Sequence, residues 1–227
     1  GSLIPPPMEQ QVRSLDDVGS VAQLGQSTFT VRVDGGDQTD AVIIGTDNQE
    51  LFRPTTLNGG RFPREQGEAV GSDSDFAVGD SVLIVSSNGS AEVNLTVVGI
   101  AEDVELSVSP TLFTDLETFQ EAVRATNPDA QEILPNGLAV SPAKGVSADA
   151  AVSAINDSSP DLDALTRTDA ANESPGVAQV RQSFSLIFLL YGLVVPLVTG
   201  LFFLILTLQK AQSLTLLRAM GASKKML

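Results

Sequence analysis

The sequence predicts an α+β protein in three parts: a two-lobed domain outside the membrane, one long transmembrane helix, and a short C-terminal helix. Three observations predict this organisation. Residues 18–100 are rich in short alternating segments, residues 111–166 mix strand and helix patterns, and residues 184–208 contain no charged side chain. The first two predict a β-rich lobe followed by a βαβαβ-like lobe, and the third predicts the membrane span.

The uncharged stretch runs from Phe184 to Leu208 and contains 25 residues. At about 1.5 Å of rise per residue, a helix of this length crosses a hydrocarbon core of about 30 Å. A single span must satisfy its backbone hydrogen bonds internally, so only a helix is compatible with lipid. Ser174 followed by Pro175 predicts the start of this helix, which leaves a stalk of about two turns before the span.

Charged residues are divided unequally between the two sides of the span. All 28 acidic residues and nine of the 13 basic residues precede Phe184, so the net charge is −19 before the span and +4 after it. Cytoplasmic flanks carry the excess of Lys and Arg, so we expect the short tail inside the cell and the large N-terminal part outside. A charge of −19 also argues against nucleic acid as a partner.

The first part of the outer domain has the pattern of β-strands. Val18 to Val33 and Ala41 to Thr46 are expected to pair across a turn at Gly35-Gly36. Asn88-Gly89 predicts a second hairpin, because both residues accept the positive φ of a type I′ turn. The other segments expected here are a short helix at Met8 to Asp16 and strands at Glu68 to Gly71, Ser81 to Ser86 and Ala91 to Ile100.

From Thr111 onward the pattern mixes strands with helices. Leu112 and Phe113 are expected in a strand, and Thr114 is expected to cap the following helix, with Glu117 completing a capping box. The remaining segments of this expected βαβαβ-like lobe are a strand at Gly137 to Ser141, a helix at Ser147 to Asn156 and a strand at Leu162 to Thr166.

Residue types needed for most enzymatic chemistry are missing from the sequence. The chain has no His and no Cys, which excludes the usual zinc clusters and His- or Cys-based catalysis. It also lacks a phosphate-binding Gly-x-x-x-x-Gly-Lys loop. We therefore expect no enzyme activity, no catalytic residue, no cofactor and no metal site in this chain. Its acidic pairs lack calcium-loop spacing and are interpreted as loop surface: Asp16 and Asp17, Asp73 and Asp75, Glu102 and Asp103, and Asp161 and Asp163.

The tail from Ser213 to Leu227 reads SLTLLRAMGASKKML. Its apolar residues recur at helical spacing and are rimmed by basic ones, which predicts a compact amphipathic helix. Such a helix would lie on the anionic inner leaflet or fill a groove on a cytoplasmic protein. The run LRAMGASKK resembles the permease subunits of MacB/FtsX/LolC-type ATP-binding-cassette transporters, which usually have Ile or Leu in place of Met220. The resemblance implies a coupling helix that contacts the ATPase through Leu214, Leu217, Arg218, Ala219, Met220, Gly221, Ala222, Ser223, Lys224 and Lys225.

The outer domain carries a second resemblance to the same family. Four short motifs occur in the family's order: GRFP at residues 60–63, GEAV at 67–70, GD at 79–80 and VVGI at 97–100. We interpret them as architectural, with glycines at tight turns and the arginine paired with a carboxylate. The residues concerned are Gly60, Arg61, Pro63, Gly67, Glu68, Gly79, Asp80 and Gly99.

The resemblance implies that the chain is a piece of a four-span permease in a prokaryotic cell membrane. Residues 1–173 would be the extracytoplasmic core domain, residues 174–209 the stalk and span, and residues 210–227 the cytoplasmic coupling helix. An earlier span would end near Leu3. The expected partners are an ATP-binding-cassette ATPase subunit, a second permease copy in a homodimer, the lipid bilayer and an extracytoplasmic protein.

Three functions remain open from the sequence. The first is an export or efflux permease that transmits ATP-driven movement to its outer domain, a mechanism called mechanotransmission. The second is an FtsX-like regulator that recruits or activates an extracellular cell-wall hydrolase. The third is a single-span structural or receptor protein without an ATPase. Association of the full-length protein with an ATPase would exclude the third, and capture of a hydrolase by the outer domain would favour the second.

Overall fold

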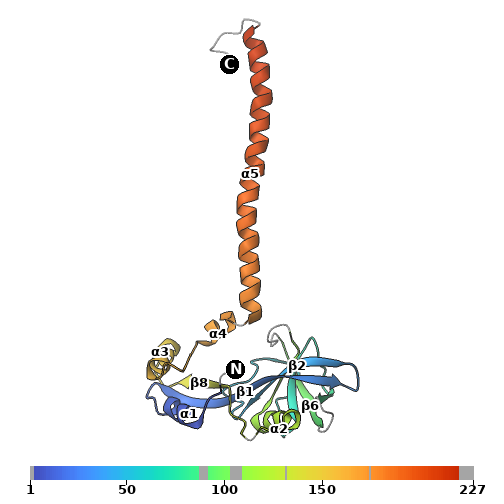
Figure 1. The fold of residues 1–227 in the computed structure, drawn as a ribbon, viewed down its shortest axis with the longest axis vertical. Helices are drawn as coiled ribbons and strands as arrows, with labels where there is room; N and C mark the ends of the chain where they lie inside the picture. Colours follow the sequence, from blue (N-terminus) through green and yellow to red (C-terminus); the bar gives the residue numbers. More distant parts are fainter. Residues whose placement is uncertain (1–2, 87–91, 103–108, 131, 174, 220–227) are drawn as a thin grey trace. The chain divides into compact units, whose positions relative to one another are not determined.

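The computed structural model describes residues 3–86, 92–102, 109–130, 132–173 and 175–219 (Figure 1). The chain divides into two compact units, Gly1–Gly176 and Val177–Leu227, which we call the outer domain and the membrane unit. The strands are β1 (Val18–Val33), β2 (Gln38–Thr46), β3 (Leu57–Gly60), β4 (Glu68–Ser72), β5 (Ser81–Val85), β6 (Glu92–Ala101), β7 (Thr111–Asp115) and β8 (Gly137–Pro142). The helices are α1 (Pro6–Arg13), α2 (Leu116–Thr126), α3 (Ala148–Ser158), α4 (Arg167–Glu173) and α5 (Pro175–Ala219).

Six strands of the outer domain close into a ring. The hydrogen-bonded order is β2-β7-β4-β6-β5-β1, and β1 also pairs with β2, which completes the circle. The β2–β7 and β4–β6 pairs are parallel, whereas the other pairs in the ring are antiparallel. Strand β3 is added to β6. We call this ring, together with β3 and helix α2, the barrel lobe.

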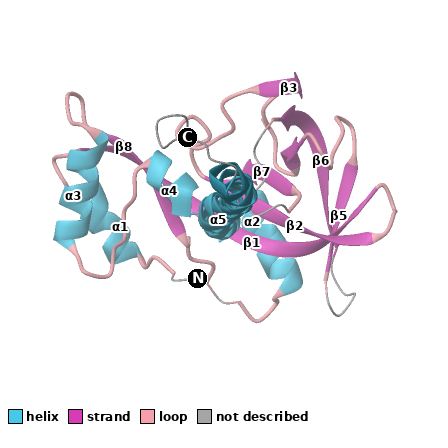
Figure 2. Cartoon of the chain, turned by 90° about the horizontal axis from the view of Figure 1, so that it is seen from above, coloured by secondary structure: helices cyan, strands magenta, loops and turns pink. Residues whose placement is uncertain are grey.

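Strand β1 is longer than the ring requires and continues into a second lobe. Its first part, from Val18 to Leu24, pairs with β8, whereas residues from Leu24 to Arg32 pair with β2. Helices α1 and α3 pack beside β1 and β8 (Figure 2). We call the first part of β1 together with α1, β8 and α3 the small lobe.

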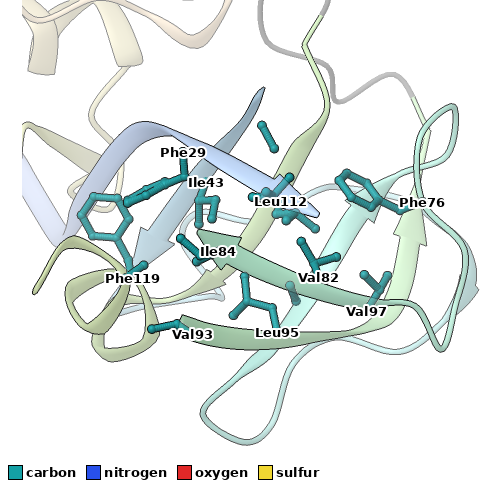
Figure 3. Close-up of a cluster of buried hydrophobic side chains, with 14 of the residues drawn as sticks. Phe29, Ile43, Phe76, Val82, Ile84, Val93, Leu95, Val97, Leu112 and Phe119 are labelled. Atoms are coloured by element: carbon teal, nitrogen blue, oxygen red, sulfur yellow. The ribbon is translucent and has the colours of Figure 1, made fainter. Parts of the chain in front are cut away.

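The barrel lobe has its own hydrophobic core (Figure 3). Alternate residues of the ring strands point inward, and Phe119 of α2 closes one side by meeting the Phe29 ring edge-on, with 6.0 Å between ring centroids. Helix α2 starts at Asp115, whose carboxylate accepts a hydrogen bond from the Thr118 amide at 2.8 Å. The buried members of this core include Val31, Ile43, Ala69, Val82, Ile84, Leu95, Val97 and Leu112.

The small lobe is held by a separate and smaller cluster. Val12 of α1, Val21 of β1 and Ile155 of α3 are buried together. Partly buried residues packed against them are Leu15, Val18, Leu138, Val140, Leu162 and Ala164. Because the two clusters are distinct, each lobe is stabilised by its own apolar contacts.

The α+β class with one long apolar helix is confirmed, but the boundary between the lobes differs from the sequence prediction. Strand β7 and helix α2 were expected in the second lobe, yet they pack on the barrel core. The expected strand at Leu162 to Thr166 is wrong, since this segment is irregular and its side chains pack beside α3 instead. The capping prediction is also wrong, because Thr114 belongs to β7 and Asp115 caps α2.

The hairpin predictions have different outcomes. Strands β1 and β2 pair as expected, and the Gly36 amide donates to the Val33 carbonyl at 2.8 Å in the turn between them. Strands β5 and β6 also pair antiparallel, from Ser81 opposite Thr96 to Val85 opposite Glu92. The predicted Asn88-Gly89 turn itself lies outside the described residues.

Candidate functional site

The four motifs of the outer domain lie close together around β3, β4 and β6. Arg61 follows the last residue of β3, and Glu68 is the first residue of β4. The Arg61 guanidinium pairs with both carboxylate oxygens of Glu68, and its Nη1 donates to Oε2 at 2.6 Å. The same Oε2 accepts from the backbone amides of Arg64 at 2.9 Å and Glu65 at 3.3 Å. One carboxylate thus holds the loop that joins the two strands.

The environment of Glu68 favours its charged form. The pKa of Glu68 is lowered to about 2, chiefly by the hydrogen bond from Arg61. The hydrogen bond from the Arg64 amide is the next largest contribution to this lowering. The same pairing raises the pKa of Arg61. The Glu68 side chain is 14% exposed and that of Arg61 is 42% exposed. Water therefore screens the attraction between the two charges mainly at the Arg61 side.

Two glycines of the motifs allow β3 and β6 to approach each other. Gly60 has a φ of 74°, and a Cβ atom there would overlap the Val98 carbonyl. A Cβ atom on Gly99 would overlap the Arg61 carbonyl in the same way. The close approach lets the Arg61 amide donate to the Val98 carbonyl at 2.8 Å. Neither position has room for a side chain.

The other motif residues shape turns beside the same strands. Gly67 has a φ of 81°, and its amide donates to the Thr118 hydroxyl of α2 at 2.8 Å. Gly79 has a φ of 104°, and its amide donates to the Val97 carbonyl at 2.8 Å. The Asp80 carboxylate accepts from the Ala77 amide at 2.8 Å. Pro63 is buried in the loop between Arg61 and Glu68.

We expect Glu68→Gln to lower the stability of the outer domain at neutral pH by about 1 kcal/mol, because Arg61 and two loop amides lose a charged acceptor. The folded-state pKa of Glu68 lies below the ordinary value of 4.5. Its stabilising contribution is therefore complete above pH 4.5 and disappears as the pH falls through about 2. The difference in melting temperature between wild type and variant should therefore shrink as the pH is lowered from 7 to 2. Glu50→Gln, at an exposed loop position, is the control, and a constant difference at every pH would contradict the assignment.

The second candidate site is helix α5, whose Pro175 start agrees with the sequence prediction. Within it, Ile187–Leu208 has a mean hydropathy of 2.5 and none of this segment is buried by protein. Large apolar side chains such as Phe188, Leu189 and Phe203 are exposed all along it. An exposed apolar surface of this length is typical of a helix that crosses a membrane.

The structure describes some of the predicted coupling residues but not all of them, because the described part of the chain ends at Ala219. Leu214, Leu217, Arg218 and Ala219 belong to α5, which continues without interruption from the apolar segment to Ala219. The remainder of the predicted set lies outside the described residues: Met220, Gly221, Ala222, Ser223, Lys224 and Lys225. Over the part of the tail that the structure describes, the expected short helix is thus a continuation of α5 rather than a separate element.

The structure brings together several residues that the sequence patterns do not single out. Arg53 lies over the Phe62 ring at 4.4 Å from its centroid, next to the Arg61 loop. Asp47 and Asn136 bond the backbone of β1 with their side chains. The local sequence gives no signal for these two contacts, because each bond joins residues that are far apart in the chain. In the described ranges, no group of three or more acidic residues is arranged to hold a metal ion.

Residues 2–158 match the family model of the MacB-like periplasmic core domain. The chain belongs to this family. The MacB-like core domain is a periplasmic domain of transporter permeases, and here it precedes a helix that is long and apolar enough to span a membrane. The chain is therefore a membrane-anchored permease-type protein with its N-terminal domain outside the cytoplasm.

Solved structures of similar domains come from several bacteria. The periplasmic region of MacB from Actinobacillus actinomycetemcomitans is 16% identical, with 66% of this chain and 70% of that chain covered at a TM-score of 0.46. The extracellular domain of the noncanonic ABC-type transporter YknZ from Gram-positive bacteria is 13% identical, with 67% and 82% covered at a TM-score of 0.45. A domain of a putative permease protein from Porphyromonas gingivalis is 13% identical, with 66% and 68% covered at a TM-score of 0.40. Among curated proteins, none matches the chain significantly.

Proposed function

We propose that the chain is part of a permease subunit that couples ATP hydrolysis by a cytoplasmic partner to movement of its extracytoplasmic domain, for export or efflux. The observation that carries this proposal is the continuity of α5, which includes both the apolar segment and the first part of the tail motif. Its 45 residues correspond to about 68 Å of helix. A single element of this length reaches from one side of a bilayer to the other with several turns to spare.

A continuous helix is a suitable element for transmitting movement. Its backbone hydrogen bonds resist bending, so displacement of one end shifts or tilts the whole rod. Pro196 is the one proline inside α5, and it removes a single backbone donor from the middle of the apolar segment. Spans tolerate such a position, often with a slight kink, without losing the helix.

The tail provides the chemistry for a cytoplasmic contact. It carries four basic residues and no acidic residue after Leu208. Leucines spaced along the same segment supply apolar contact area, which is the combination expected of a helix seated in a groove of a partner protein. We propose that this partner is an ATP-binding-cassette ATPase, with Arg218 and its neighbours at the contact.

The test uses the full-length permease purified with its ATPase and reconstituted into lipid nanodiscs. We expect Arg218→Glu to abolish the stimulation of ATP hydrolysis by the permease, because charge reversal places a carboxylate at the proposed contact. Lys144→Glu is the matched control, since it makes the same charge change at an exposed position of the outer domain.

Retained stimulation by Arg218→Glu would overturn the proposed coupling contact. Loss of stimulation in both variants would also count against it, because the effect would then follow net charge rather than position. Loss in Arg218→Glu alone, with normal expression and membrane insertion, supports the proposal.

A further inference from the structure

Strand β1 is the element that joins the two lobes of the outer domain. Its ladder with β8 ends at Leu24 opposite Gly137, and its ladder with β2 begins at Leu24 opposite Thr46. Within the described residues, the regular pairing of the two lobes therefore overlaps at this one position. Figure 1 shows β1 running from α1 and β8 to β2. A strand paired on one edge at a time would bend easily at such a crossing.

Two side chains extend the pairing on both sides of Leu24. The Asn136 amide group behaves like an added backbone unit: its Oδ1 accepts from the Gln26 amide at 2.9 Å, and its Nδ2 donates to the Gln26 carbonyl at 2.6 Å. The Asn136 backbone amide also donates to the Leu24 carbonyl at 3.0 Å. Asn136 directly precedes β8, so it lengthens the contact of the small lobe with β1.

Asp47 makes the corresponding contact from the barrel lobe. It directly follows β2, and its Oδ1 accepts from the Gln23 amide at 2.8 Å. Its own amide approaches the Gln23 carbonyl at 3.4 Å. Together, Asn136 and Asp47 widen the region in which β1 is held on both edges from Leu24 alone to Gln23 through Gln26.

The position of this crossing gives it mechanical importance. The small lobe contains α3, which leads through α4 to α5 along the chain. The barrel lobe, by contrast, is built from the second part of β1 and the elements β2 to α2, and its core is separate from that of the small lobe. Because β1 is the one described strand that both lobes share, the crossing is a direct route by which a displacement of the small lobe reaches the barrel lobe.

We propose that Asn136 and Asp47 form a clamp on β1 that makes the two lobes move as one body. The direction of the movement rests on the proposed function, but the stiffness of the crossing does not. Asn136 and Asp47 are positioning residues in this mechanism, because they act through the backbone of β1 and contact neither ligand nor ATPase.

The test measures the distance between the lobes with spin labels in the full-length protein, in nanodiscs. Gln10→Cys on α1 and Glu117→Cys on α2 are exposed helical positions, one in each lobe. The 227 residues contain no other cysteine, and any cysteine elsewhere in the protein is replaced by serine. We expect one narrow distance distribution for the clamped protein and a broader one for Asn136→Ala. The Gln26 backbone amide loses its acceptor in this variant, so its hydrogen exchange should become roughly fivefold faster.

Asn156 provides a matched control within the small lobe. Its side chain makes the same two-sided bond to a single residue, since Nδ2 donates to the Ala164 carbonyl at 3.1 Å and Oδ1 accepts from the Ala164 amide at 2.6 Å. Asn156→Ala removes an equivalent pair of bonds without touching the crossing. It should leave the interlobe distribution narrow.

Equal widths for wild type and Asn136→Ala would overturn the clamp, and so would equal broadening in Asn136→Ala and Asn156→Ala. Adding ATP and the ATPase separates the clamp from the proposed function. If the proposed function is wrong, nucleotide leaves the interlobe distance unchanged in both proteins, yet Asn136→Ala still broadens the distribution. If both are right, nucleotide changes the interlobe distance in Asn136→Ala and leaves it unchanged in the clamped protein.

Discussion

Phe119→Ala should destabilise the outer domain by about 3–5 kcal/mol, as is typical for removing a buried phenylalanine. Phe119 is 4% exposed and connects α2 to the barrel core. Its ring lies against Gly25 of β1 and its Cβ lies against Gly45 of β2, so a Cβ atom on either glycine would overlap Phe119. The loss corresponds to a fall of roughly 10 °C in melting temperature, measurable by circular dichroism.

A double-mutant cycle tests whether the ring really requires Gly25. Gly25→Ala alone should cost about 1–3 kcal/mol, because the added methyl group meets the Phe119 ring. When Phe119 is already alanine, the same substitution should cost little or even restore stability, since the methyl group enters the space left by the ring. Additive losses in the double variant would contradict the packing described here. Gly137→Ala is a suitable control, because its nearest neighbour, the Leu24 Cβ, is 3.4 Å away.

Single-cysteine labelling should give opposite results for the two ends of the chain. A membrane-impermeant maleimide added to intact spheroplasts should modify Lys144→Cys and leave Lys224→Cys unmodified until the membrane is permeabilised. The physical reason is that the short tail after the span carries four basic residues and no acidic residue, and such basic flanks stay in the cytoplasm. The 227 residues have no native cysteine, which keeps the background low.

The labelling result bears directly on the direction of coupling. Modification of Lys224→Cys before permeabilisation would place the tail outside and remove the proposed ATPase contact. Lack of modification of Lys144→Cys, together with modification after permeabilisation, would place the outer domain inside.

Val198→Arg offers a separate check, because a charge near the middle of the apolar segment costs about 2.5–3.5 kcal/mol on insertion scales and should reduce membrane integration.

Local sequence patterns predicted the strands and the span well. Polar and apolar residues alternate from Thr28 to Val33, and the bounds of β1 agree with the predicted Val18–Val33. The membrane helix is equally clear, because a long uncharged segment has few alternative structures. These features depend on residues that are neighbours in the chain, so their physical causes are visible without the fold.

Long-range relations were harder to predict. The ring closes through pairs such as β2 with β7, whose residues are far apart in sequence and parallel in direction. The wrong lobe assignment of α2 has the same origin, since it depends on Phe119 meeting Gly25 and Gly45 rather than on the helix pattern itself. Leu162 to Thr166 was predicted to be a short strand, yet Asn156 on α3 bonds Ala164 and holds the segment beside that helix instead. A side-chain amide that bonds the backbone N–H and C=O of one residue, as a neighbouring strand would, leaves no periodic pattern in the sequence.

The closed ring also affects how neighbouring molecules meet on the membrane surface. Exposed edges of sheets are templates for pairing with strands of other chains, and proteins crowded in two dimensions encounter such edges often. Closure leaves the ring strands largely paired with one another, and among the described strands β3 and β8 each pair with a single neighbour, β8 at the end of the sheet. That strand has six residues and ends at Pro142, which has no amide hydrogen to donate. Among the described strands, the edges left open to strand addition are therefore short.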